Sequence, residues 1–212
     1  MISASSTGYR VSSPHPSFQI AFLTGQSRPS SCALSPVQHV FLERLAAATG
    51  TIAVPANYPY HGRDGTWRPT FLPVASLRNA VQFLRALRRR GVGRSRAFFG
   101  VSALLEQAGH TVFLAGSCGL QLLVALDLPE VLLARCSFVA FGPVAVERPA
   151  CPGLVVTGRR DWVAWRHRLR ADHTVECGHL GYLENRDFPA ICAGFVREQQ
   201  ARVRRAGHAA AL

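Results

Sequence analysis

The chain has 212 residues, a length typical of one domain, and apolar residues make up 48% of it, as in ordinary globular proteins. Charged residues are only 17%, which excludes a disordered polar chain and a coiled coil, and no apolar run approaches the ~20 residues of a membrane-spanning helix. The first seventeen residues lack the apolar middle region of a secretory signal. We therefore expect a soluble cytoplasmic protein with a polar N-terminal segment (1–17), one domain (18–205) and a C-terminal tail (206–212).

The charge of the chain is strongly positive. All 24 basic residues are arginine, and with 12 acidic residues the formal net charge is +12. Such a charge suits nucleic acid or another acidic partner, but the arginines are not interleaved with aromatic residues that stack on bases. Biased composition is the simpler explanation, and a nucleic-acid partner is the least favoured class.

The cysteines and histidines show no metal-binding pattern. No pair of the six cysteines is spaced C-x-x-C, and no Cys/His cluster has the spacing of a zinc site. Most of the cysteines lie within apolar runs, where a free thiol behaves as a small hydrophobic group. We expect reduced thiols and no metal.

Predicted strands and helices alternate along the chain. Apolar, β-branched runs predict strands at Phe18–Leu23, Thr51–Val54, Thr111–Ala115, Cys136–Phe141, Gly153–Val156 and His173–Cys177. Capping residues and helical spacing predict helices at 36–50, from Ser76 to Gly91, and at Val101–Ala108, Leu120–Leu126 and Phe188–Arg204. Nearly continuous apolar strands are typical of a mostly parallel sheet with helices on both faces, so the predicted class is a single α/β domain.

The run AGSCG, residues 115–119, follows the third predicted strand and precedes a helix. A nucleophile on such a sharp turn needs small residues two positions before and two positions after it. Ser117 has alanine and glycine at those positions, whereas Cys118 would have glycine and the bulky Leu120. Ser117 is therefore the better candidate nucleophile, although a thiol is intrinsically the stronger one.

Two later strands are also followed by residues that can do chemistry. Asp161 lies in TGRRDW after the fifth predicted strand, and His179 lies in CGHLGYL after the sixth. Because the carboxyl ends of parallel strands share one edge of the sheet, we expect Ser117, Asp161 and His179 at that edge. Together with AGSCG, these motifs in the order Ser, Asp, His resemble the α/β-hydrolase family, from about Phe18 to the C-terminal helix.

The resemblance implies a Ser-His-Asp triad. Ser117 would be the nucleophile, His179 the base, and Asp161 the carboxylate that orients the imidazole ring. The resemblance also implies an oxyanion hole formed by the backbone N–H groups of Cys118 and Gln26, the latter just after the first predicted strand. Such a triad supplies nucleophile and base together, so no cofactor is expected.

The chain departs from the family's pattern in several ways. Ala115 replaces the commonest glycine of the turn, and the spacings between the three motif residues, 44 and 18 positions, are short. Residues 142–152 leave no room for an inserted helical lid. These departures predict a minimal, lidless hydrolase and argue against a lipase that opens at a lipid surface. Asp172 is an alternative acid to Asp161, but it precedes a strand.

The expected mouth of the site is lined by Gly25 after the first strand and by Tyr58, His61 and Trp67 in the long connection 56–75. The aromatic side chains either wall an acyl pocket or pack the loop onto the core, and ordinary burial favours packing. Arg159 and Arg160, beside Asp161, would attract an anionic substrate such as a coenzyme A thioester or an acidic acyl carrier. Exposed charge without a role is the simpler alternative.

The predicted function is hydrolysis of a small carboxylic ester or thioester by a serine hydrolase through an acyl-enzyme intermediate. Two alternatives share the fold: a non-catalytic binding protein, and an acyltransferase that uses the same triad. A basic, nucleic-acid-associated protein is the remaining class.

Overall fold

The computed structural model describes residues 17–26, 31–60, 67, 72–88 and 95–209. Its strands are β1 (Phe18–Thr24), β2 (Ile52–Tyr58), β3 (His110–Gly116), β4 (Cys136–Phe141), β5 (Gly153–Gly158) and β6 (His173–Val175). Its helices are α1 (Pro36–Thr49), α2 (Leu72–Arg88), α3 (Arg96–Gln107), α4 (Gly119–Ala125), α5 (Glu130–Leu133), α6 (Trp162–Trp165) and α7 (Phe188–Ala209).

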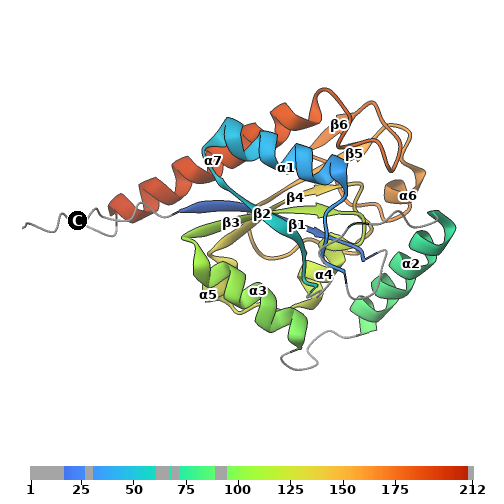
Figure 1. The fold of residues 1–212 in the computed structure, drawn as a ribbon, viewed down its shortest axis with the longest axis horizontal. Coiled ribbons are helices and arrows are strands. Elements are labelled where there is room, and N and C mark those ends of the chain that lie inside the picture. The colour runs from blue at the N-terminus through green and yellow to red at the C-terminus, as the bar shows by residue number, and fades with distance from the viewer. Residues whose placement is uncertain (1–16, 27–30, 61–66, 68–71, 89–94, 210–212) are drawn as a thin grey trace, which may run out of the picture.

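The six strands form one sheet in the order β2-β1-β3-β4-β5-β6, and every neighbouring pair is parallel. Helices lie on both sides of this sheet, with α1 and α7 on one side and α3, α4 and α5 on the other (Figure 1). The predicted α/β class with a parallel sheet is confirmed. All strands point the same way, so their carboxyl ends lie along a single edge.

Alternate residues of each strand belong to different cores. Ile20 and Phe22 of β1 pack in a cluster with residues of α1 and α7, whereas Ala21 and Leu23 pack in a cluster with residues of α3 and α4. This alternation follows from the two-residue period of a strand. Both faces of the central strands are therefore buried, which explains why their sequences are almost continuously apolar.

Helix α1 begins and ends where its sequence predicts. The Ser35 side chain accepts a hydrogen bond from the Gln38 N–H, and the Gln38 side chain accepts one from the Ser35 N–H, which forms a capping box. Pro36 occupies the first turn, and Gly50 ends the helix in the left-handed region at φ 64°.

Strand β2 is longer than predicted, because it continues past Pro55 to Tyr58 instead of ending at Val54. It lies at the edge of the sheet, where the missing N–H of a proline is tolerated. The pairing register shifts at this point, since consecutive residues of β1 pair with Val54 and then with Asn57. The irregularity accommodates the proline without ending the strand.

Several helix ends also differ from the predictions. Helix α2 begins at Leu72, ahead of the predicted cap Ser76, and α7 continues to Ala209 instead of ending at Arg204. Helix α3 begins at Arg96 because the Ser95 side chain accepts a hydrogen bond from a first-turn N–H, a cap that the apolar pattern does not indicate. The four-residue helices α5 and α6 were not predicted.

Among the described helices, none has the length and apolar character needed to cross a membrane.

His110, at the start of β3, is buried with its Nε2 atom 3.0 Å from Ser137 Oγ. Burial and, secondarily, the positive charge of Arg202 lower the pKa of His110 to about 4. The unfolded chain, with a histidine pKa near 6.5, binds more protons than the folded chain between these two values. Folding stability therefore decreases as the pH falls from about 6.5 towards 4.

We expect His110→Gln to remove this part of the acid sensitivity, which amounts to up to about 3 kcal/mol of unfolding free energy. Denaturant unfolding at about pH 7 and pH 4.5 measures it. His173→Gln, at an exposed histidine, is the matched control and should keep the pH dependence of the wild type. The assignment to His110 is wrong if both variants lose stability on acidification as the wild type does.

Candidate active site

Ser117 lies on a tight turn between β3 and α4. Its φ angle of 52° is in the left-handed region, which costs a non-glycine residue on the order of 1–2 kcal/mol. Close contacts explain the small residues beside it: a Cβ atom on Gly119 would lie 1.8 Å from the Leu23 carbonyl oxygen, and one on Gly116 would lie 2.6 Å from the Phe141 ring. The turn is therefore packed directly against β1 and β4.

The structure brings the three predicted side chains together at the carboxyl edge of the sheet. Ser117 Oγ lies 3.1 Å from His179 Nε2. His179 Nδ1 lies 3.0 Å from each carboxylate oxygen of Asp161. The Asp161 side chain is fully buried, whereas the His179 side chain is 23% exposed, so the histidine and serine are the members that a substrate can reach.

The Asp161 carboxylate is surrounded by hydrogen-bond donors. Its Oδ1 accepts from the Ala164 N–H at 3.0 Å, and its Oδ2 accepts from the Tyr182 hydroxyl at 2.6 Å. Burial acts to raise the pKa of Asp161, but hydrogen bonds from His179, Ala164 and Tyr182 and the charge of the imidazole outweigh it and leave the pKa below its usual value. The carboxylate is therefore ionised at neutral pH, as a partner for imidazolium must be.

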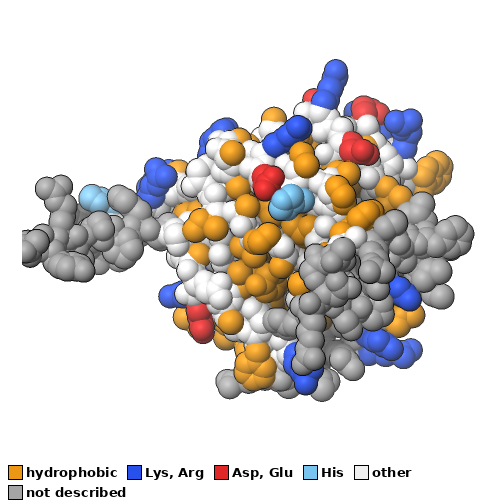
Figure 2. All heavy atoms as spheres, in the orientation of Figure 1, with side chains coloured by type: hydrophobic (Ala, Val, Ile, Leu, Met, Phe, Trp, Pro, Cys, Tyr) orange, Lys and Arg blue, Asp and Glu red, His pale blue; other side chains and the backbone are white. Residues whose placement is uncertain are grey.

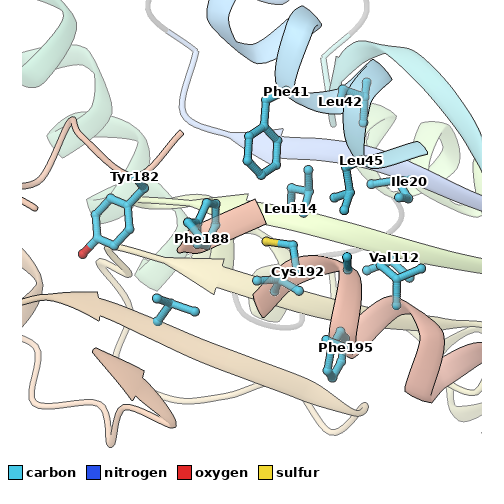
Figure 3. Packing of buried hydrophobic residues seen from close by; sticks show 14 of the residues in the cluster. Ile20, Phe41, Leu42, Leu45, Val112, Leu114, Tyr182, Phe188, Cys192 and Phe195 are labelled. Carbon is cyan, nitrogen blue, oxygen red and sulfur yellow. The ribbon is translucent and has the colours of Figure 1, made fainter. Parts of the chain in front are cut away.

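Tyr182 is a site residue that the sequence did not indicate. Its hydroxyl donates to Asp161 and accepts from the Gly158 N–H at 2.6 Å, while its ring packs beside Phe188 and Phe141. Figure 3 shows the Tyr182 hydroxyl pointing away from this apolar cluster. Tyr182 lies within the motif CGHLGYL, but nothing in the spacing of the motif distinguishes a tyrosine that bonds Asp161 from one that only packs in the core.

Asp172, the alternative acid, lies in a different environment. Its Oδ2 accepts from the Val155 N–H at 2.8 Å and pairs with Arg148 at 3.0 Å. Its neighbours are thus a strand backbone and an arginine, and the imidazole of His179 is bonded to Asp161 instead.

The Cys118 thiol is buried beside the turn. Burial raises its pKa to about 12, so the thiolate that would make it a nucleophile is not formed at neutral pH. Its backbone N–H lies at the start of α4, among the N–H groups that have no acceptor within the helix. The buried, protonated thiol of Cys118 is therefore a poor nucleophile at neutral pH.

Both backbone groups of Gln26 are hydrogen-bonded to the side chain of Gln82 on α2. Its N–H donates to Gln82 Oε1 at 2.8 Å, and its carbonyl accepts from Gln82 Nε2 at 3.0 Å. The Tyr60 hydroxyl also donates to Gln82 Oε1, at 3.1 Å. In this conformation the Gln26 N–H therefore points to a protein acceptor, and sequence reasoning did not identify Gln82.

The other predicted mouth residues have different surroundings. A Cβ atom on Gly25 would lie 2.3 Å from Asn79 Oδ1 and 2.8 Å from Cys118 Sγ, so the glycine permits a close approach at the turn. Tyr58 packs partly buried against the core, and Trp67 is exposed.

The two arginines beside the acid are exposed, and Arg159 forms an ion pair with Glu176. Arg160 donates its backbone N–H to the Cys177 carbonyl at 3.1 Å. His61 lies outside the described residues. No group of three or more His, Cys, Asp or Glu residues is arranged to hold a metal ion in the described part of the chain.

The parallel sheet, the strained serine after β3 and the Ser-Asp-His order at one edge are the combination found in α/β hydrolases. These features resemble the α/β-hydrolase pattern, and the described residues form an α/β fold around a six-stranded parallel sheet. No protein-family model and no curated protein matches the chain.

Among solved structures, the chain is similar to a provisionally assigned hydrolase of the alpha/beta superfamily from Xanthomonas campestris pv. campestris. The identity is 17% and the TM-score 0.41, over 87% of this chain and 98% of that chain. Because both values are low, this likeness assigns no site residue and no substrate.

Tyr182→Phe removes one donor to Asp161 and one acceptor for the Gly158 N–H. Both partners are buried, so we expect the free energy of unfolding at about pH 7 to fall by about 1–3 kcal/mol. Tyr58→Phe, at a partly buried ring, is the control and should change it by less than about 0.5 kcal/mol. Equal, small effects of the two variants would show that the Tyr182 hydroxyl does not stabilise the site.

Proposed function

We propose that this protein is a serine hydrolase that cleaves a carboxylic ester or thioester through an acyl-enzyme intermediate. The observation that carries the proposal is the continuous hydrogen-bonded series Ser117–His179–Asp161, with its serine on the strained turn after β3. A serine hydroxyl is a weak nucleophile until a base accepts its proton, and the imidazole nitrogen at 3.1 Å is within the required reach.

In the proposed reaction, Ser117 Oγ attacks the carbonyl carbon of the substrate, and its proton passes to His179 Nε2. The buried carboxylate of Asp161 holds the Nδ1–H of the ring and stabilises the imidazolium that forms. Collapse of the tetrahedral intermediate breaks the bond to the alcohol or thiol, which takes the proton from His179. A water molecule then gives a proton to the imidazole and attacks the acyl-serine, which releases the acid and restores Ser117.

The negative oxygen of the tetrahedral intermediate needs backbone donors, and we assign the Cys118 N–H as one of them. The Gln26 N–H is the expected second donor, but it is bonded to Gln82 in the structure. In our proposal the oxyanion competes with the Gln82 carboxamide for this N–H. Substrate turnover then includes displacement of Gln82 from Gln26.

The arginines beside the acid bear on the acyl group or carrier of the proposed substrate. Arg160 is exposed beside Asp161, whereas Arg159 is already paired with Glu176, so Arg160 is the better of the two for an anionic acyl group or carrier. Transfer of the acyl group to an alcohol or amine would use the same triad, with that nucleophile in place of water.

Ser117→Ala tests the proposed nucleophile. We expect kcat for a p-nitrophenyl ester to fall at least about 10⁴-fold, because the residual rate comes from binding and the oxyanion donors alone. Covalent labelling by a fluorophosphonate should disappear in the same variant. Ser102→Ala, at a serine on α3, is the control and should keep both properties.

Two outcomes would contradict the proposal. A folded wild-type protein that neither turns over esters nor reacts with the fluorophosphonate would favour a non-catalytic binding protein of the same fold. Labelling with turnover only when an alcohol or amine acceptor is present would favour an acyltransferase.

Gln82→Met tests the competition at the oxyanion hole. Methionine has a similar shape but lacks the carboxamide, so the variant releases the Gln26 N–H and the Tyr60 hydroxyl from their acceptor. The oxyanion then no longer has to displace the Gln82–Gln26 hydrogen bond, which is worth about 0.5–1.5 kcal/mol. We therefore expect kcat/KM for a small ester to rise about 2- to 10-fold. A fall in kcat/KM would show instead that Gln82 holds Gln26 in its working position.

A further inference from the structure

Helix α6 carries an unusual set of exposed apolar side chains. Trp162 is 76% exposed and Trp165 is 54% exposed, and their rings lie side by side with centroids 6.2 Å apart. Val163, between them, is also exposed. Large aromatic side chains are normally buried in soluble proteins, so two adjacent exposed tryptophans indicate a surface that is covered by a partner.

This surface adjoins the candidate active site. Asp161 is the N-cap of α6, so Trp162 follows the buried acid directly. Leu180, which is 73% exposed, follows His179 in the same way. Because Asp161 and His179 are hydrogen-bonded to each other, the backbone positions of Trp162 and Leu180 also lie near each other at this edge. We call Trp162, Val163, Trp165 and Leu180 the apolar rim.

Basic side chains flank the apolar rim. The segment 159–170 contains five arginines and a single acidic residue, Asp161, whose carboxylate is buried. Arg160 precedes α6, and Arg166 and Arg168 follow it, all three exposed. Hydrophobic side chains lie beside basic and some acidic side chains at the end of the molecule where α6 lies (Figures 1 and 2).

We propose that the apolar rim and its flanking arginines dock this protein onto an anionic lipid surface. Tryptophan prefers the boundary between headgroups and acyl chains, and arginine is attracted to anionic headgroups beside it. The whole chain, at +12, is attracted to such a surface as well.

A lipid surface fits the apolar rim better than a protein partner does. Four exposed side chains on a four-residue helix and one loop form a small patch, whereas a stable protein interface buries ~800 Å² on each partner. Insertion into headgroups needs no shape complementarity, and docking of a permanently exposed patch needs no lid. The docking does not depend on the proposed hydrolysis, although it would bring a lipid ester to Ser117.

Co-sedimentation with vesicles tests the docking. The Ser117→Ala protein serves as the parent, so that binding is measured without turnover and independently of the proposed activity. We expect it to bind vesicles of phosphatidylcholine with about 30% phosphatidylglycerol and to lose binding steeply as salt increases. Adding Trp162→Ala and Trp165→Ala should weaken binding at least about tenfold. Phe99→Ala, at an aromatic residue on α3 that is 55% exposed, is the matched control and should bind as the parent does.

Tryptophan fluorescence gives a second measurement. The chain has three tryptophans, so in a Trp67→Phe background all tryptophan emission comes from Trp162 and Trp165. On anionic vesicles we expect a shift of this emission to shorter wavelength and quenching by brominated acyl chains. Quenching should be absent with vesicles of phosphatidylcholine alone.

Three results would overturn the proposal. One is a folded parent that does not sediment with anionic vesicles at low salt. Another is sedimentation that is unchanged in the Trp162→Ala/Trp165→Ala variant, which would reduce the effect to non-specific charge. The third is tight, tryptophan-dependent binding to a soluble acidic acyl carrier protein without binding to vesicles, which would identify the apolar rim as a protein interface.

Discussion

The buried carboxylate of Asp161 is the constraint on which the candidate site depends. A carboxylate removed from water is costly unless donors surround it, and here they come from the imidazole of His179, the Tyr182 hydroxyl and the Ala164 N–H. These donors belong to α6 and to the loop after β6, so both segments converge on one charge. The same hydrogen bonds that satisfy the carboxylate orient the imidazole toward Ser117.

The sheet positions the third side chain of the candidate site, Ser117. Gly119 and Gly116 let the turn after β3 pack against the backbone of β1 and the Phe141 ring of β4, with no room for a Cβ atom at either position. The strained φ angle of Ser117 is thus held by packing from both neighbouring strands. The serine is presented at the carboxyl edge, where the loops after β5 and β6 bring the other two side chains.

Two neighbouring helices border this edge of the sheet, since the rings of Phe83 on α2 and His167 just after α6 have centroids 5.2 Å apart. Helix α2 places Gln82 against the backbone of Gln26 at the expected oxyanion hole. Helix α6 exposes Trp162 and Trp165 beside the acid and histidine. We propose that the first feature regulates access to the oxyanion donors and that the second brings the rim to its substrate. In this proposal α2 controls the oxyanion donors and α6 docks the rim.

The sequence by itself determined the class of fold and the three side chains that meet. Apolar runs define most of the strands, small residues around Ser117 define the turn, and the common direction of parallel strands places Asp161 and His179 at the same edge. Local signals could not indicate Tyr182, whose hydroxyl bonds Asp161 21 positions earlier, or Gln82, which bonds Gln26 56 positions earlier. The course of β2 through Pro55 likewise depended on its place at the edge of the sheet. Tertiary structure alone decided these features, because each rests on a partner that only the folded chain brings near.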